Sequence, residues 1–184
     1  MSDHSHRVID TIEQAFAGVQ LKEGLTLREA IVLDNYGTVA ERQQARSQGE
    51  LGDWRSIPDE TIACYSASLA FLDATAMRFY LPAFMRFALR HYGRSDSPSI
   101  NYTIHVLEPF RGSGAANIDF VFEKLTEEQR QSLGKALATT EPREGLNAKF
   151  KDLHTYQAEK FSLLTEAQRD AVRAFLEFMA AKGV

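Results

Sequence analysis

The sequence predicts a mainly α-helical fold, a compact single domain over residues 1–184 with one possible short β-hairpin. Apolar residues recur at the three- and four-residue spacing of helices, and pairs of Thr with Glu or Gln three residues later mark helix starts. The segment from Met77 to Tyr92 carries five Phe or Tyr side chains and three Arg. Because a surface segment rarely has so much aromatic area, we expect this one to form the centre of the core.

Length and charge limit the class of protein. The 184 residues, 44% hydrophobic and 25% charged, suit one globular domain that needs no disulfide or metal for stability. A net charge of −4, without a block of like charges, argues against a nucleic-acid binder that relies on a general positive field. Cys64 is the single cysteine, which indicates a reducing compartment. The chain lacks a signal-peptide core and any apolar run of roughly 18 residues, so we expect a soluble cytoplasmic protein outside the membrane.

The sequence predicts three helices in the N-terminal third of the chain. Residues 1–24 form a helix and a loop, since an apolar stripe that starts at Val8 ends near Gly18. Thr26 and Glu29 form a capping box, which opens a helix that stops near Gly37. Residues 38–48 favour a helix by propensity but have little to bury, so we expect a polar, exposed helix.

In the middle of the chain, the spacing of apolar residues fits both a helix and two short strands. Residues 69–72 and 77–80 form a hairpin in the preferred interpretation, because Leu81 precedes Pro82 and is thereby disfavoured in the α region. A continuous helix is the alternative. Pro82 then suits the first position of a helix that Gly93 closes.

Two interpretations of residues 100–122 remain open. Apolar residues alternate with polar ones from 100 to 106, which favours a strand, although Ile100, Ile104 and Leu107 also fit a helix. Further on, Thr126 and Thr165 each precede a Gln by three residues and open a helix in the same way. The polar stretch 139–155 is expected to be a loop.

Catalytic, metal and cofactor signatures are not found. Cys64 lies beside an apolar face with no adjacent basic residue, so we interpret it as a small buried filler rather than a nucleophile. The histidines lack the spacing of a metal site, and Asp59 and Glu60 suit the first turn of a helix. Gly112 and Gly114 lack the residues that complete a phosphate loop. We therefore predict no catalytic residue, no metal and no cofactor.

A binding site is the most informative functional candidate. It combines the Arg trio with two aromatic side chains, and its members are Arg78, Tyr80, Arg86, Arg90 and Trp54. These groups could hold a carboxylate, a phosphate or an acidic partner surface. The competing interpretation is that the Arg side chains brace the core margin by pairing with nearby acidic residues, and that Trp54 pins its loop to the core.

Several segments resemble an uncharacterised bacterial family of unknown function. The matching residues include Leu27 to Ala30, Asp53 with Trp54, Leu69 to Ala83 with its RFYLPA segment, and Phe161 to Gln168 with its F-x-x-L-T-x-x-Q helix start. The family tends to have Gly where this chain has Ala76. The resemblance implies fold boundaries and no known activity.

The functional expectation is a non-enzymatic interaction protein, such as an immunity or adaptor protein with a protein partner. The alternative is an enzyme that acts on a small anionic substrate through Arg78, Tyr80, Arg86 and Arg90. The sequence leaves the oligomeric state open.

Overall fold

Helices make up the regular structure of the chain in the computed structural model, which describes residues 3–110 and 159–183. No strand occurs in these two ranges, so the expectation of a mainly α-helical fold is confirmed. The α-helices are α1 (Asp3–Ala15), α2 (Leu27–Asp34), α3 (Val39–Ser47), α4 (Asp59–Cys64), α5 (Ala74–His91), α6 (Ser99–Val106) and α10 (Glu166–Ala180). Three short 3-10 helices are η1 (Trp54–Ser56), η2 (Ser66–Ala70) and η3 (Glu108–Phe110).

Both described ranges contribute to one compact unit. The predicted helix start at Thr126, the glycines 112 and 114 and the predicted loop 139–155 lie outside the described residues. That residues 1–184 form a single domain therefore stays a prediction.

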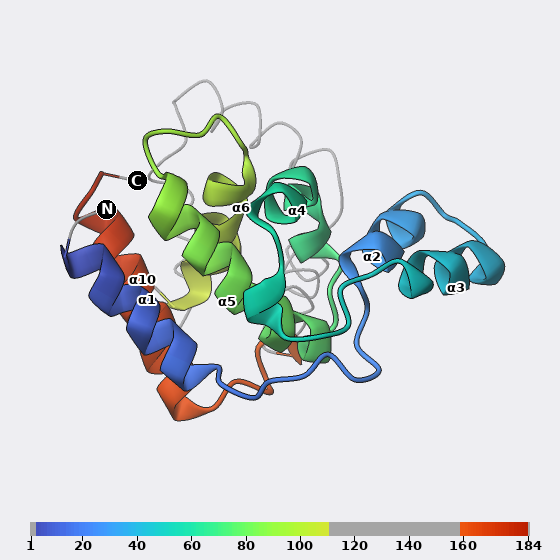
Figure 1. Cartoon of the computed structure of the whole chain (residues 1–184), viewed down its shortest axis with the longest axis horizontal. Helices are drawn as coiled ribbons and strands as arrows, with labels where there is room; N and C mark the ends of the chain where they lie inside the picture. Colours follow the sequence, from blue (N-terminus) through green and yellow to red (C-terminus); the bar gives the residue numbers. More distant parts are fainter. Residues whose placement is uncertain (1–2, 111–158, 184) are drawn as a thin grey trace, which may run out of the picture. The chain divides into compact units, whose positions relative to one another are not determined.

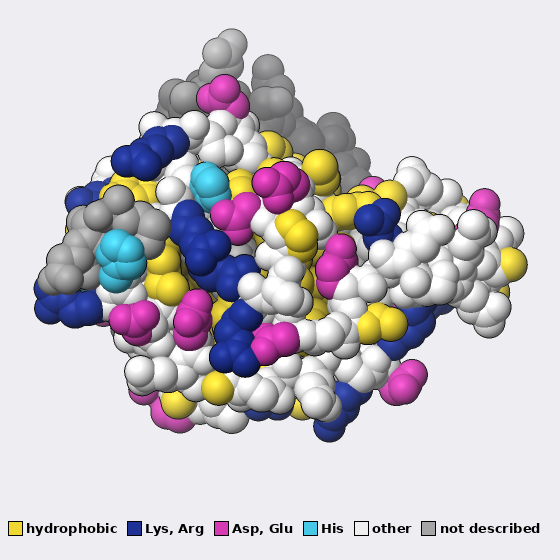
Figure 2. Space-filling view, viewed as in Figure 1, with side chains coloured by type: hydrophobic (Ala, Val, Ile, Leu, Met, Phe, Trp, Pro, Cys, Tyr) yellow, Lys and Arg dark blue, Asp and Glu magenta, His cyan; other side chains and the backbone are white. Residues whose placement is uncertain are grey.

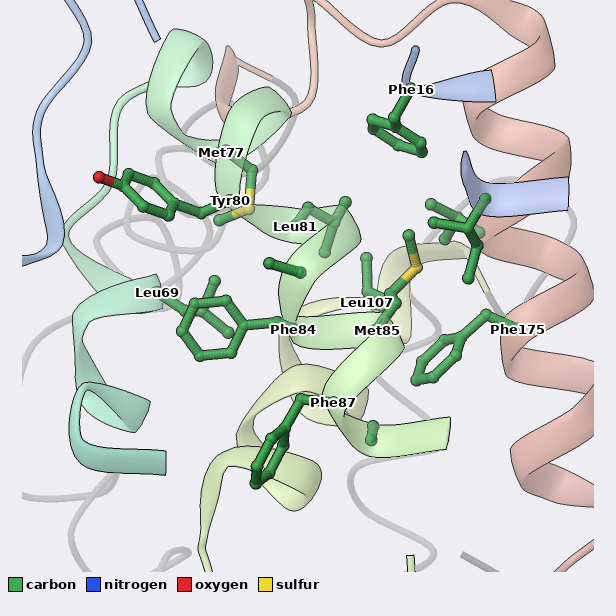
Figure 3. Close-up of a cluster of buried hydrophobic side chains, with 14 of the residues drawn as sticks. Phe16, Leu69, Met77, Tyr80, Leu81, Phe84, Met85, Phe87, Leu107 and Phe175 are labelled. Carbon is green, nitrogen blue, oxygen red and sulfur yellow. The ribbon is translucent and has the colours of Figure 1, made fainter. Parts of the chain in front are cut away.

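Helix α5 lies at the centre of the core (Figure 3). Its side chains are buried from Ala76 to Leu89 except for the half-buried Arg78, as expected for the aromatic segment. Figure 3 shows Phe84 directed toward Leu69 of η2, whereas Met85 lies on the other side of α5, the side on which Phe175 of α10 lies. Since a fully buried Phe or Met side chain contributes roughly 1.5–3 kcal/mol, a helix buried on most sides organises the elements around it.

The predicted hairpin is wrong, because residues 74–91 form one continuous helix that begins at the N-cap Asp73. One carboxylate oxygen of Asp73 accepts a hydrogen bond from the Ala76 amide (2.8 Å), and the other accepts one from the Leu25 amide (2.9 Å). Pro82 lies inside the helix and not at its first position. The free energy by which the residue before proline disfavours the α region is small compared with the free energy gained by burying a whole helix. Packing therefore determines that this segment is helical. The predicted helix end at Gly93 is confirmed, since this glycine follows the C-cap residue and has φ of 70°.

Helix α6 settles the ambiguous period of residues 100–106 in favour of the helix, so the favoured strand is wrong. Ile100, Ile104 and Leu107 are buried, and they are spaced four and three residues apart, as residues on one helix face are. The hydroxyl of Ser99 donates to the carbonyl oxygen of Ile62 (2.7 Å) and ties α6 to α4.

Helices α1 and α10 come from opposite ends of the chain and lie side by side (Figure 1). They run antiparallel, because His4 stacks on Phe178 at 5.4 Å between ring centroids while Gln168 donates to the Ala15 carbonyl oxygen (3.1 Å). The predicted capping box of Thr165 and Gln168 is confirmed at the start of α10.

Helices α2 and α3 form a hairpin that projects from the rest of the unit (Figure 1). Each begins with a capping box, the predicted one of Thr26 and Glu29 and a second one of Thr38 and Glu41. No residue of α3 is buried, which confirms the expected polar, exposed helix.

The two described ranges meet where the first one ends and the second one begins. Phe110 packs edge-to-face against Phe161 with 5.0 Å between the ring centroids. The ammonium of Lys160 donates to the carbonyl oxygens of Leu69 (3.1 Å) and Ala70 (2.7 Å) at the end of η2. The end of the first described range and the start of the second therefore lie close together.

Candidate functional site

Three of the predicted binding residues, Trp54, Arg86 and Arg90, are gathered where η1 and α4 meet α5. Trp54 is 1% exposed and donates from its indole nitrogen to the Phe16 carbonyl oxygen (3.0 Å). The guanidinium carbon of Arg86 lies 5.3 Å from the centroid of the Trp54 ring. This placement agrees with the interpretation that Trp54 pins its loop to the core.

Arg86 is a buried cation, 4% exposed, that donates to the main chain within η1 and directly after it. Its Nη1 donates to the Arg55 carbonyl oxygen (2.9 Å), and its Nη2 donates to that of Ile57 (3.2 Å). Burial lowers the pKa of Arg86, the charge of Arg90 lowers it further, and the charge of Asp59 opposes the shift. Arg86 thus fixes the path of the chain around Trp54.

The outer edge of this cluster pairs with acidic groups. Arg90 forms an ion pair with Asp59 (3.4 Å), as the bracing interpretation expects. The Nε2 atom of His91 lies 2.7 Å from the other carboxylate oxygen of Asp59, a contact that sequence reasoning missed. Figure 2 shows basic side chains of this face flanked by acidic ones, so no broad positive patch covers it.

Arg78 and Tyr80 lie apart from that cluster, each with its own partner. Arg78 donates from Nε to the side-chain oxygen of Gln168 in α10 (3.1 Å). The Tyr80 hydroxyl donates to the Glu50 carbonyl oxygen (3.3 Å). Burial raises the pKa of Tyr80 well above 10, and the Glu50 charge adds to the rise, so the phenol stays neutral. The five predicted residues therefore do not converge on one site.

Cys64 is exposed, so its interpretation as a buried filler is wrong. It stands at the end of the short helix α4, whose inner face is supplied by Ile62. Among the described residues, no three His, Cys, Asp or Glu side chains are grouped to hold a metal ion. In the same part of the chain, no helix has the length and apolar character to cross a membrane.

The tip of the α2–α3 hairpin exposes an aromatic side chain in an unusual backbone conformation. Tyr36 is 97% exposed and has φ of 55°, the left-handed region that L side chains rarely adopt. Its amide donates to the Leu33 carbonyl oxygen (3.0 Å), and the Gly37 amide donates to that of Val32 (2.7 Å). These two bonds form the Schellman helix end, in which glycine usually occupies the position held here by tyrosine.

Much of the exposed surface next to Tyr36 is uncharged, although the carboxylates of Asp34 and Glu41 are also exposed there. Val39 is 69% exposed, and the further exposed side chains of α3 other than Glu41 are small or amide groups, namely Ala40, Gln43, Gln44 and Ser47. In Figure 2 the projecting α2–α3 end is mostly white, the colour of uncharged polar side chains and backbone. We call this set, with Tyr36 and Val39, the hairpin face. Charged side chains are depleted at the centre of protein interfaces, and among the exposed side chains of α3 only Glu41 is charged.

Sequence reasoning singled out the exposed helix but missed Tyr36. The signal was present, because a helix end was expected near Gly37 and an aromatic residue directly precedes that glycine. Only the coordinates show that Tyr36 itself takes the left-handed position and points into solvent.

A second feature is a hollow between two loops. Residues 18–22 form one wall, residues 51–53 form the other, and Arg46 of α3 lines it as well. It lies away from the five predicted binding residues, none of which lines it.

The fold and the internally paired Arg side chains do not by themselves define a function, so the chain was compared with known protein families. The chain belongs to DUF6714, a family of unknown function, whose model matches residues 4–156. The match ends before α10, so the C-terminal F-x-x-L-T-x-x-Q segment falls outside it. No curated protein matches the chain, and no solved structure does either.

Proposed function

We propose that this protein is a non-enzymatic interaction module of the bacterial cytoplasm, of the adaptor or immunity type, and that the hairpin face docks onto a partner protein. The observation that carries the proposal is Tyr36, which is 97% exposed in a left-handed conformation at the tip of a projecting hairpin. The left-handed conformation costs a residue with a Cβ roughly 1–2 kcal/mol relative to the usual region. Glycine would avoid that cost, so a tyrosine here favours a role outside the fold.

The partner that fits this surface is a different protein with an apolar pocket. Tyrosine is enriched at interface hot spots, because its ring fills a pocket at low entropic cost while its hydroxyl finds a hydrogen-bond partner at the rim. Val39 and the uncharged side chains of the hairpin face would surround the anchor, and covering these side chains removes no water from a charge.

The internal partners of Arg78, Tyr80, Arg86 and Arg90 support a bracing role for these residues rather than an enzymatic site. Their donated hydrogen bonds go to groups of the same chain, and they do not face one common hollow. We therefore favour the interaction module over an enzyme for a small anionic substrate.

Photo-crosslinking in the native host tests the proposal. A benzoylphenylalanine placed at position 36 is compared with the same group at position 102, where Tyr102 is 46% exposed on α6. We expect a heterologous adduct from position 36 alone. The captured protein, once purified, should bind the wild-type chain and lose at least about tenfold in affinity with Tyr36→Gly.

Stability measurements on the same variant separate docking from folding. Tyr36→Gly should raise the free energy of unfolding by about 0.5–1 kcal/mol, because it relieves the left-handed strain. A variant that is more stable but binds less well supports docking. Adducts that are equal at both positions, an adduct to a second copy of this chain, or unchanged affinity of the variant would contradict the proposal.

A further inference from the structure

The hollow between residues 18–22 and 51–53 has the size of a small-molecule site. Its volume is about 470 Å³, within the range of 300–1,000 Å³ that is usual for ligand pockets. Val19 and Leu51 supply its apolar lining, and Lys22, Arg46 and Asp53 supply its charges. The hollow lies beside the root of α3 and is separate from the hairpin face.

Arg46 is anchored in this wall and keeps donors to spare. Its Nη1 donates to the Gly24 carbonyl oxygen (2.8 Å) and to Glu29 (3.1 Å), and its Nη2 donates to the Lys22 carbonyl oxygen (2.6 Å). A guanidinium has five N–H groups. Within the described part of the chain, the Nε hydrogen and one Nη2 hydrogen of Arg46 are therefore left without an acceptor. Two N–H groups on adjacent nitrogens match the two oxygens of a carboxylate or phosphate.

The acidic side chain that lines the hollow and the one that pairs with Arg46 are already engaged by the chain itself. Asp53 accepts hydrogen bonds from the amide and the guanidinium of Arg55, which hold its pKa below the usual range and keep it ionised. Glu29 accepts from the Thr26 amide as well as from Arg46. By contrast, Lys22 is exposed, and its ammonium makes no hydrogen bond or ion pair to the described residues. Among the charged side chains that line the hollow, the one without a partner in the described residues is thus the Lys22 ammonium.

We propose that this hollow is a binding site for a small organic anion that carries a carboxylate or phosphate group and a short apolar chain. Arg46 donates its two spare N–H groups to the anion, and Lys22 adds a second positive charge. Val19 and Leu51 contact the apolar chain. Arg46 is already held by three hydrogen bonds, so little side-chain entropy is lost when the anion binds.

Amide chemical shifts in the ¹⁵N-labelled full-length protein test this assignment. Butyrate, butyl phosphate and butylammonium are titrated separately to tens of millimolar. We expect butyrate or butyl phosphate to shift the amides of Gly18, Gln20 and Gly52 with saturation. Acetate should bind more weakly than butyrate, because it lacks the chain that Val19 and Leu51 would contact. Shifts with butylammonium alone, or shifts without saturation, would overturn the proposal.

Matched charge variants locate the anion. Lys22→Gln should weaken butyrate or butyl phosphate binding about fivefold without altering the fold, since that ammonium holds no part of the chain. Arg94→Gln removes an equally exposed charge outside the hollow and should leave affinity unchanged. Equal losses in the two variants would mean general attraction to positive charge and would refute the site. The hairpin face is not involved, so this result is independent of Tyr36.

Discussion

The side chain of Arg86 carries a charge into the interior, where it is 4% exposed, and there it acts as a structural cation. Two main-chain carbonyl oxygens and the face of Trp54 replace part of the water that it loses, while its Nε atom is buried without a hydrogen-bond partner. Removing such a group leaves its acceptors buried and unpaired, a larger cost than the hydrogen bonds are worth in net terms.

Replacing Arg86 with Gln should therefore lower the free energy of unfolding by about 2–4 kcal/mol in urea titrations. Arg90→Gln is the matched control, because Arg90 is partly exposed and makes a single ion pair at 3.4 Å with Asp59. We expect a loss of about 1 kcal/mol or less for that variant. Similar losses from both variants would refute the structural role assigned to Arg86.

Lys160 is a second buried cation, and burial lowers its pKa from 10.5 to about 8. Below pH 8 the lysine is protonated in both the folded and the unfolded chain, so the cost of burying its charge is fully present. Between pH 8 and 10.5 the unfolded chain binds more protons than the folded one. Stability contributed by this residue therefore rises with pH over that interval.

The pH dependence is measured as the difference in unfolding free energy between the wild type and Lys160→Met. That difference should move in favour of the wild type by up to about 3 kcal/mol from pH 7.5 to 10, since one pKa unit corresponds to about 1.4 kcal/mol. Other titrating groups cancel in the comparison. A difference that is independent of pH would show that Lys160 titrates normally.

At the scale of elements, Gln168 links three helices from one cap position. Its side-chain oxygen accepts from the Thr165 amide (3.1 Å) and from Arg78 of α5, and its nitrogen donates to Ala15 at the end of α1. The side chain is 1% exposed, so each lost partner is left buried. The cap thus joins local helix initiation to the packing of α10.

Gln168→Ala should accordingly cost about 3 kcal/mol, whereas Thr165→Ala should cost about 1 kcal/mol, the usual value for an N-cap alone. Thermal and urea unfolding of both variants measure the two losses. Equal losses would mean that the bonds from Gln168 to α1 and α5 contribute nothing beyond the cap.

At the scale of the molecule, the described unit closes on itself where Phe110 meets Phe161. Helices α1 and α5 precede residues 111–158 in the sequence, and α10 follows them. The three helices pack against one another. The unit should therefore fold without that stretch, because the ends to be joined already lie together.

Replacement of residues 112–158 by a flexible linker of about six residues, a length that easily spans such neighbouring ends, tests this directly. We expect cooperative thermal unfolding and a helical circular dichroism spectrum. A chain that melts without cooperativity, or that shows little helix, would mean that the unit depends on the deleted residues.

Sequence reasoning succeeded where the determinant is local. The capping boxes at Thr26 and Thr165 and the helix end near Gly93 depend on residues a few positions apart, and all three were predicted. The polar helix over residues 38–48 was also predicted, since its sequence has little to bury. The candidate site was predicted only as a set of residue types, and the structure separates Arg78 and Tyr80 from Trp54, Arg86 and Arg90.

The failures share one cause. The hairpin at residues 69–80 was preferred because of the bias before Pro82. A strand at residues 100–106 was favoured because apolar residues alternate there, and the helix was left open as the alternative. Both segments are helical because their side chains pack into a core that other parts of the chain supply. Cys64 is exposed for a related reason, since Ile62 supplies the buried face of α4.

By itself, the sequence determined the helical class of this protein, the starts of its helices and the segment that forms its core, because hydrophobic period and capping act within a few residues. Only the tertiary structure decided that residues 74–91 are one helix, that the Arg side chains have internal partners, and that Tyr36 stands in solvent. Those outcomes depend on burial against residues distant in sequence, and the free energy of that burial exceeds the local preferences that oppose it.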